Sequence, residues 1–253
     1  MPMKLTIVGC GDAFGSGGRL QTGYHVDLGS DGGDHRFLID CGATSIIGLN
    51  RCGIDPNGIA TIFISHLHGD HFGGLVWWLL HTQHVAKRAT PLVVVGPPGI
   101  EARTLSAAEA LFPGSTKVAR RYELSFIECH PGTPLSVGPV TVTAWEVSHP
   151  SGAPSLALRF EAGGKVLAFS GDTEWVEALV PVSAGADLFI TECYAFDGPV
   201  RYHTSWEILE RNLPRITARR LLLTHMNSAM LARRHEIVRP NVLLAEDGLV
   251  VDV

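Results

Sequence analysis

The sequence predicts a layered α/β protein with mixed β-sheets. Short apolar segments separated by glycine recur along the chain of 253 residues, as expected for many short strands. Some of these segments flank tight turns as hairpins, whereas others alternate with helical segments. Hairpins give antiparallel neighbours and strand–helix alternation gives parallel ones, so we expect sheets that contain both kinds of pairing.

The first part of the chain contains the clearest hairpin. Segments 23–29 (GYHVDLG) and 35–42 (HRFLIDCG) flank the turn sequence SDGGD at 30–34, a pattern that is typical of two antiparallel strands. We expect an earlier strand at 5–9 (LTIVG). The run IATIFISH at 59–66 is rich in β-branched residues, which predicts a strand covered on both faces.

Helical and strand-like segments alternate after this run. The expected helices cover residues 74–88, 101–112, 173–181 and 204–216. The expected strands cover residues 92–99, 122–129, 139–147, 155–161, 165–172, 186–194 and 220–225. The EAGGK turn predicts a hairpin between the fourth and fifth of these strands, and a short helix and a closing pair of strands follow the last. No repeat or low-complexity linker interrupts the pattern, so we expect one domain over residues 1–253.

Composition limits the class of protein. The formal net charge of −5, from 20 basic and 25 acidic residues, argues against a general binder of polyanions such as nucleic acid. The five cysteines form no C-x-x-C pair, and the N-terminus lacks the long apolar stretch of a signal peptide. The longest strongly apolar run, LVWWLL, is far too short to cross a bilayer. We therefore expect a cytoplasmic protein that makes no membrane contact.

A glycine-rich stretch at 9–18, GCGDAFGSGG, invites a nucleotide-binding interpretation. Its spacing is not G-x-G-x-x-G, and a strand rather than a helix is expected to follow it. We interpret it as a flexible turn near the start of the chain.

The segment FISHLHGDHFGG gathers four polar ligand-type residues in six positions: His66, His68, Asp70 and His71. In an extended chain the first two can point the same way, and the others follow as the chain turns into a helix. Imidazole and carboxylate groups are costly to bury without partners. They are also good ligands for zinc, manganese or iron, so the segment predicts a metal site.

The H-x-H-x-D-H pattern, followed by two glycines, resembles the signature of the metallo-β-lactamase superfamily. Other segments agree in order: LIDCG at 38–42, VSHPSG with His149, FSGDT with Asp172 and LLLTHMN with His225. The resemblance covers nearly the whole chain. It implies an αββα sandwich, with two mixed β-sheets flanked by helices and a dinuclear metal site at one edge.

The resemblance also implies which residues hold two divalent ions, which we expect to be zinc, with manganese or iron as alternatives. One ion would take His66, His68 and His149. The other would take Asp70, His71 and His225, and Asp172 would bridge the two ions. A bridging hydroxide would then act as nucleophile in a hydrolysis reaction, and Asp70 would orient it or accept its proton.

Several of these residues have structural alternatives. Asp172 could cap the helix expected after it, and His225 could be a buried structural histidine. His130 also follows a strand, but the family pattern places the third histidine just before the hairpin that ends at the bridging aspartate, which favours His149. His81 and His84 are three residues apart on an expected helix, and we assign them to its polar face.

The segment TECYAFDG, followed by RYHTSWE, resembles ribonuclease Z and its phosphodiesterase relatives. The resemblance implies that Glu192 pairs with His203, which would deliver a proton to the leaving alkoxide. The alternative for His203 is a surface histidine before a helix. T-S-W-E also has the form of a capping box, with Thr204 as N-cap and Glu207 at the third helical position, so we assign Glu207 to structure.

One departure from ribonuclease Z concerns the substrate. Bacterial members of that family carry a long arm that grips transfer RNA, commonly between the third histidine and the bridging aspartate. Only 22 residues separate His149 from Asp172 here, and a hairpin accounts for them. We therefore expect a phosphodiesterase without this arm, acting on a small phosphodiester, including cyclic ones, or on an RNA 3′ end.

Two other functions remain open. One is a superfamily hydrolase of a carbonyl substrate, such as a lactone, thioester or β-lactam. The other is a metal-binding accessory protein of cofactor biosynthesis. Trp77, Trp78 and Trp206 are candidates for lining the substrate pocket, although large aromatics at helical spacing are more often core residues. The family resemblance also indicates a homodimer.

Overall fold

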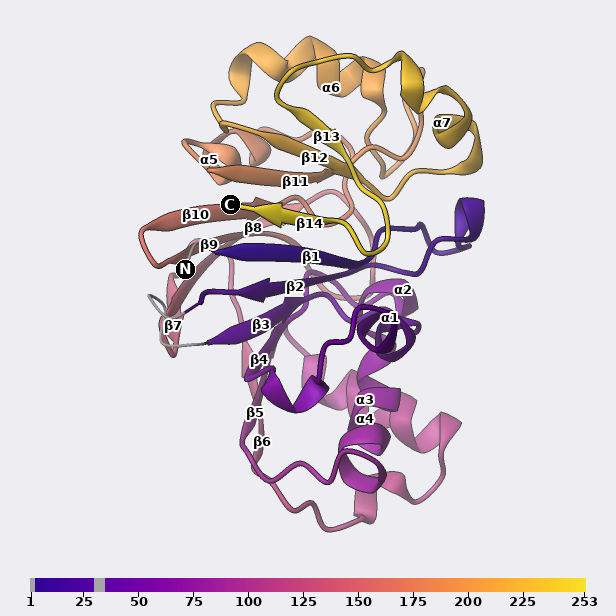
Figure 1. Cartoon of the computed structure of the whole chain (residues 1–253), viewed down its shortest axis with the longest axis vertical. Coiled ribbons are helices and arrows are strands. Elements are labelled where there is room, and N and C mark those ends of the chain that lie inside the picture. The colour runs from indigo at the N-terminus through magenta and orange to yellow at the C-terminus, as the bar shows by residue number, and fades with distance from the viewer. Residues whose placement is uncertain (1–2, 30–34) are drawn as a thin grey trace.

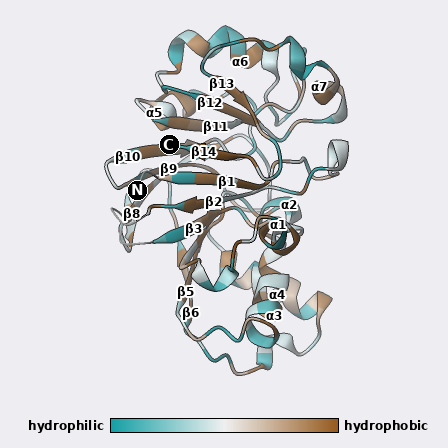
Figure 2. Ribbon diagram, in the orientation of Figure 1, coloured by the Kyte–Doolittle hydropathy of each residue, from teal (hydrophilic) through white to brown (hydrophobic). Residues whose placement is uncertain are grey.

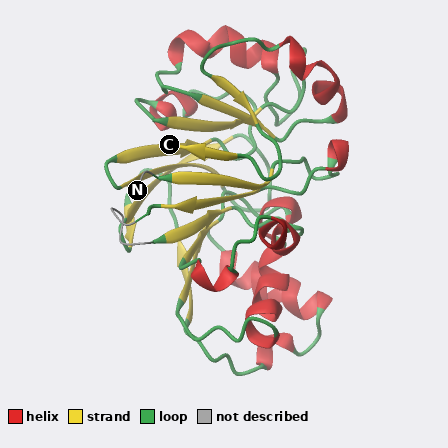
Figure 3. Ribbon diagram, in the orientation of Figure 1, coloured by secondary structure: helices red, strands yellow, loops and turns green. Residues whose placement is uncertain are grey.

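Two seven-stranded sheets pack face to face, with helices on both outer faces (Figure 1, Figure 3). The structure is a computed structural model that describes residues 3–29 and 35–253. This arrangement confirms the expected αββα sandwich. The SDGGD turn of the first expected hairpin falls outside the described residues, but the two strands beside it are antiparallel neighbours.

The first sheet has the order β14-β1-β2-β3-β4-β5-β6. In that order its strands are Val250–Asp252, Lys4–Gly9, Gly23–Asp27, Arg36–Ile39, Thr61–Phe63, Leu92–Gly96 and Leu124–Glu128. Strands β3 to β6 are parallel, whereas β14, β1, β2 and β3 are antiparallel neighbours. Four helices accompany this sheet: α1 (Ser45–Arg51), α2 (Gly69–Phe72), α3 (Gly74–His84) and α4 (Ile100–Leu111).

The second sheet has the order β13-β12-β11-β10-β9-β8-β7. In that order its strands are Val242–Leu244, Leu221–Thr224, Leu188–Glu192, Lys165–Phe169, Ser155–Ala162, Val140–Val147 and Leu135–Val137. Strands β10 to β13 are parallel and β7 to β10 antiparallel, so both sheets are mixed as predicted. Helices α5 (Leu179–Ser183), α6 (Trp206–Asn212) and α7 (Ser228–Arg233) cover its outer face.

Hydrophobic residues concentrate along the strands (Figure 2). Between the sheets, Phe37 and Phe63 pack on Phe160 with ring centroids 5.4 and 5.0 Å apart, which ties β3 and β4 to β9. One further apolar layer lies between each sheet and its helices. None of the helices in the described ranges combines the length and apolar character needed to cross a membrane.

Two expected elements differ from the structure. The helix expected over 173–181 begins only at Leu179, because long-range hydrogen bonds hold the preceding segment. Ser148 Oγ donates to Glu174 (2.5 Å), and the Thr173 hydroxyl accepts from the Ser148 N–H (3.1 Å). The closing strands β13 and β14 do not pair with each other, since they join different sheets. The short strand β7 was not predicted.

Candidate metal centre

The predicted ligand residues follow strand ends of both sheets. His66 comes soon after β4, and Asp70 and His71 lie on the short helix α2. His149 follows β8 and Asp172 follows β10, while His225 comes directly after β12. Parallel strands carry their carboxyl ends to the same edge of a sheet, so residues far apart in sequence meet at one end of the sandwich.

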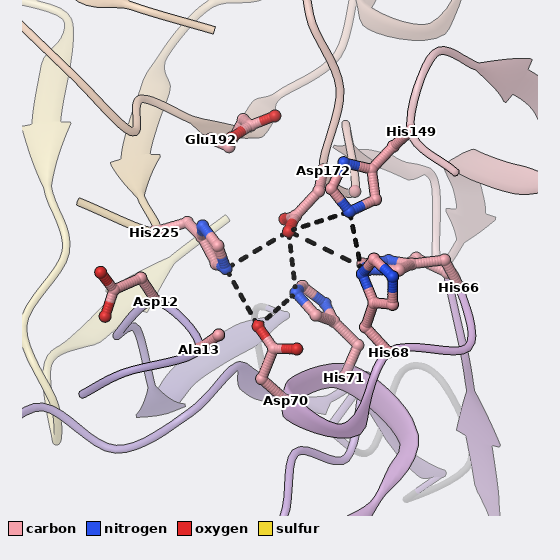
Figure 4. Close-up of polar contacts among 12 residues, drawn as sticks. Asp12, Ala13, His66, His68, Asp70, His71, His149, Asp172, Glu192 and His225 are labelled. Carbon is pink, nitrogen blue, oxygen red and sulfur yellow. Dashed lines mark hydrogen bonds and ion pairs between the residues drawn. The ribbon is translucent and has the colours of Figure 1, made fainter. Parts of the chain in front are cut away.

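All seven predicted residues meet in two adjoining groups (Figure 4). In each group one potential ligand atom from every residue lies within 4.8 Å of the others; the groups are His66, His68 and His149, and Asp70, His71, Asp172 and His225. Asp172 Oδ2 connects them. It lies 3.3 Å from Nε2 of His71 and of His225, and 3.9 Å from Nε2 of His66 and of His149.

The donor atoms fit divalent metal ions. Nε2 of His66 and of His71 is buried without a hydrogen-bond partner among the described residues. His68 Nδ1 and His149 Nε2 face each other at 3.0 Å. Buried ring nitrogens that converge in this way are costly unless something pairs with them, and imidazole with carboxylate suits zinc, manganese or iron.

Neighbouring groups orient the histidine rings. His149 Nδ1 donates to the Tyr202 carbonyl oxygen (3.0 Å), and Ser65 Oγ lies 3.1 Å from His66 Nδ1. In both rings this leaves Nε2 directed into the cluster. Outer partners of this kind set the ring tautomer of metal-binding histidines.

Asp40 orients His71, a role that was not predicted from the sequence. Its buried carboxylate accepts from His71 Nδ1 (2.6 Å), the Ser65 N–H (2.7 Å) and the Ser65 hydroxyl (2.7 Å). The backbone of Asp40 has a φ of 56°, which turns the chain sharply after β3. The LIDCG segment contained this residue, but its contact with His71 spans 31 positions and has no local sequence signal.

The electrostatics of the cluster reflect its carboxylates. Burial raises the pKa of Asp172, but His225 and His71 outweigh it and hold that pKa well below the usual range. Burial also opposes protonation of His71, yet Asp172, Asp70 and Asp40 together hold its pKa well above the usual value. His66 has its pKa well below the usual value because it is buried and lies near His71. The cluster therefore provides negative charge that favours cations.

Glu192 and His203 form a pair beside the cluster. His203 Nδ1 lies 2.9 Å from Glu192 Oε2, and the other oxygen of Glu192 accepts from the Thr173 N–H. The ring of Tyr194 stacks on His203 with centroids 4.5 Å apart. Burial raises the pKa of Glu192 and lowers that of His203, so desolvation of both charged forms favours a pair with no net charge that holds one proton.

The cluster opens into a pocket of about 150 Å³. Its lining residues are Ala13, Phe14, His68, Asp70, His149, Asp172, Tyr194, His203 and His225. His203 is thus in the pocket rather than on a remote surface. Ala13 and Phe14 come from the glycine-rich stretch at 9–18, for which only a flexible turn was predicted.

Other candidates lie outside this pocket. His130 is exposed and lies 3.8 Å from Glu128, so the structure brings His149 rather than His130 into the cluster. Trp78 and Trp206 are core residues, and Trp77 lines a separate neighbouring hollow. None of the potential metal groups in the described residues includes His81 or His84.

The capping assignment before α6 needs a correction. The N-cap is Ser205, whose hydroxyl accepts from the Ile208 N–H, and not Thr204. Thr204 instead donates its hydroxyl to the Thr173 carbonyl oxygen (2.7 Å). Glu207 is structural as expected, because it accepts from the Gly198 N–H (2.7 Å). Thr204, which local sequence rules place at the N-cap, therefore makes a tertiary hydrogen bond instead, and the next residue caps the helix.

Comparisons with known proteins relate the chain to metal-dependent hydrolases. Residues 3–243 match the sequence profile of the family described as "Anti-Pycsar protein Apyc1". The probable metallo-hydrolase YhfI of Bacillus subtilis (strain 168) is 26% identical over 227 residues, 88% of this chain and 87% of YhfI. Ribonuclease Z of Anoxybacillus flavithermus (strain DSM 21510 / WK1) is 26% identical over 307 residues, 97% of this chain and 96% of that enzyme.

Solved structures show the same fold. The metallo-β-lactamase fold protein YhfI from Bacillus subtilis superposes with a TM-score of 0.78 at 23% identity, over 99% of both chains. A diphosphatase from the PhnP family superposes with a TM-score of 0.79 at 17% identity, over 99% of this chain and 98% of the diphosphatase. The two sheets and their helices therefore form a metallo-β-lactamase fold.

Proposed function

Because this chain belongs to the Anti-Pycsar protein Apyc1 family and is related to a metallo-hydrolase and to ribonuclease Z, we propose that it is a dinuclear metal-dependent phosphodiesterase. That it is a metal-dependent hydrolase follows from these relatives. The proposal that it cleaves phosphodiesters rests on one observation, the Glu192–His203 pair beside the seven-residue cluster. A phosphodiester has a poor leaving group, and such a pair offers it a proton.

Two divalent ions are proposed to bind in the cluster, with zinc preferred and manganese or iron as alternatives. His66, His68 and His149 would hold one ion, Asp70, His71 and His225 would hold the other, and Asp172 would contact both. When bound, such a pair of ions activates water near neutral pH and neutralises charge on phosphoryl oxygens.

The protein's own groups complete the reaction. A phosphodiester in the pocket would lie beside His203, whose Nδ1 faces Glu192 and whose Nε2 is on the opposite edge of the ring. From that edge the ring would donate its proton to the leaving oxygen as the P–O bond breaks. Glu192 holds the ring in place, and stacking on Tyr194 limits its rotation. Asp70, in the same pocket, would orient the attacking water.

A small phosphodiester, including a cyclic one, is the proposed substrate class. The hairpin of β9 and β10 occupies the interval between His149 and Asp172, which leaves no room there for an RNA-binding arm. The net charge of −5 gives no general attraction for RNA. The pocket of about 150 Å³ is below the usual range of ~300–1,000 Å³ for drug-sized ligands. An RNA 3′ end is the second candidate.

The experiment compares two diesters that differ only in their leaving group, p-nitrophenol or a simple alcohol. We expect His203→Asn to lower kcat for the alcohol-releasing diester by about 10²- to 10⁴-fold. The loss for the nitrophenyl diester should be much smaller, because nitrophenolate leaves without a proton. His130→Asn is the matched control, since His130 is an exposed histidine outside the cluster.

The same panel separates the other functions. A chelator should abolish all turnover, and returning Zn²⁺ or Mn²⁺ should restore it. Turnover of a lactone or β-lactam without phosphodiester cleavage would establish the carbonyl hydrolase instead. If the metal-loaded protein cleaves neither class, the accessory-protein function is favoured. A precursor tRNA with a 3′ trailer, tested beside a cyclic nucleotide, decides between RNA and small substrates.

A further inference from the structure

Phe14 presents its side chain to solvent at the rim of the metal pocket. It is 86% exposed, more than any other large hydrophobic residue in the described parts of the chain. The same pocket is lined by His68, Asp172 and His203. Since Phe14 is not part of the core, packing does not explain why an aromatic ring is held at this position.

The backbone that carries Phe14 is held by hydrogen bonds. Asp12 is buried, and its Oδ1 accepts from the N–H groups of Phe14 (3.2 Å) and Ser16 (2.9 Å). Its Oδ2 accepts from the Ser16 hydroxyl (2.8 Å), and Gln21 donates its side-chain amide to the Ala13 carbonyl oxygen (3.1 Å). Figure 4 shows the Asp12 carboxylate directed away from the metal cluster, so its role is to hold this loop.

The ends of the loop are anchored to the C-terminal part of the chain. Asp247 accepts from the N–H groups of Cys10 (3.1 Å) and Leu20 (2.8 Å), and Arg19 pairs with Glu246 (2.6 Å). Between these anchors the chain reverses at Gly15, Gly17 and Gly18, all with positive φ. The ring is therefore presented by a shaped loop, which lowers the entropic cost of binding a ligand against it.

An aromatic ring with a free face, beside a site for a phosphodiester, fits one class of substrate. Nucleotides join a phosphodiester to a flat base, and every base offers a π-face for stacking. We propose that Phe14 stacks on the base of a nucleotide phosphodiester whose phosphate lies at the metal cluster. This proposal rests on the proposed function and adds to it the residue that recognises the base.

A neighbouring hollow of about 450 Å³ offers the competing position for a base. It adjoins the metal pocket, because Ala13 and Asp70 line both. Its walls are largely apolar and include Trp77, which is 38% exposed. Trp77 already packs edge-on against Phe112 with centroids 6.1 Å apart, and it does not line the metal pocket, which favours Phe14.

The test measures KM and kcat for a cyclic nucleotide, a dinucleoside monophosphate with the same base, and glycerol cyclic phosphate, which has no ring. Phe14→Ala should raise the ratio of KM for either base-containing substrate to that for glycerol cyclic phosphate by about tenfold, as expected for one lost stacking contact. Phe14→Trp should restore the wild-type ratio. Val238→Ala, at an equally exposed apolar residue that lines neither pocket, is the control.

Calorimetry gives a readout that does not depend on turnover. Phe14→Ala should weaken binding of a nucleoside monophosphate relative to glycerol phosphate by the same factor. An unchanged ratio in both assays would overturn the proposal, as would a rise caused by Trp77→Ala instead. If the wild-type protein cleaves glycerol cyclic phosphate but the ratio does not respond to Phe14, only this proposal fails. If no phosphodiester is cleaved, the proposed function fails and the stacking role fails with it.

Discussion

Replacing Asp40 with asparagine is expected to weaken metal binding by about 10- to 100-fold. The Asp40 carboxylate is fully buried and accepts three hydrogen bonds, two from Ser65 and one from His71 Nδ1. Asparagine keeps the oxygen for the Ser65 N–H and places an NH₂ donor opposite His71. The ring must then move its proton to Nε2, the nitrogen that faces Asp70 and Asp172.

The expected loss of metal affinity follows from this change in the position of the His71 ring proton. Holding His71 in its metal-binding tautomer would set two donors against each other in a buried site, which costs about 1–3 kcal/mol. Every 1.4 kcal/mol corresponds to about a factor of ten in affinity. The estimate therefore agrees with the range expected for an outer partner of a metal ligand.

The assay is a competitive titration of Zn²⁺ against a chromogenic chelator at pH 7, with bound metal counted by elemental analysis. Asp187→Asn is the matched control, because Asp187 also accepts a backbone N–H, from Val166 (3.0 Å), and pairs with Arg219 (3.1 Å) outside the cluster. Wild-type affinity in Asp40→Asn would refute the reasoning, provided that circular dichroism shows the variant folded. Equal losses in both variants would also refute it.

Three further predictions concern stability. Burial lowers the pKa of His25 to about 4, so the unfolded chain binds this proton more readily and stability is lost as pH falls from 6.5 towards 4. In urea titrations, the free energy of unfolding of His25→Gln should therefore fall by about 2 kcal/mol less than that of the wild type when the pH is lowered from 7.5 to 5. Equal falls in the two proteins would contradict this. Arg88 is buried and donates to five carbonyl oxygens. Arg88→Met should therefore lower the free energy of unfolding by about 3–5 kcal/mol in a urea titration at pH 7.5, and a decrease below about 1 kcal/mol would contradict this. Zn²⁺ at a thousandfold excess over its Kd should raise the free energy of unfolding of the wild-type protein by about 4 kcal/mol and raise its Tm, and His66→Ala should remove most of this gain.

Much of the fold could be predicted from local patterns. The strands at 5–9, 155–161 and 165–172 and the helix at 101–112 were expected close to where they occur, because alternation, apolar runs and turn residues are local properties. Predictions failed where distant residues compete for a segment. The helix expected at 173–181 starts late because Ser148 and Glu192 hold its first residues.

The amino-acid order alone brought four ligand-type groups together between positions 66 and 71, because covalent spacing places them within a few ångströms. Family resemblance then named His149, Asp172 and His225 as their partners. Only the tertiary structure decided that strand ends from two sheets meet there, that Asp40 sets the His71 ring, and that Phe14 stands at the pocket rim. These relations depend on contacts between segments that are far apart in the chain, as in the hydrogen bond from the Cys10 N–H to Asp247 across 237 positions, and no local pattern encodes such a contact.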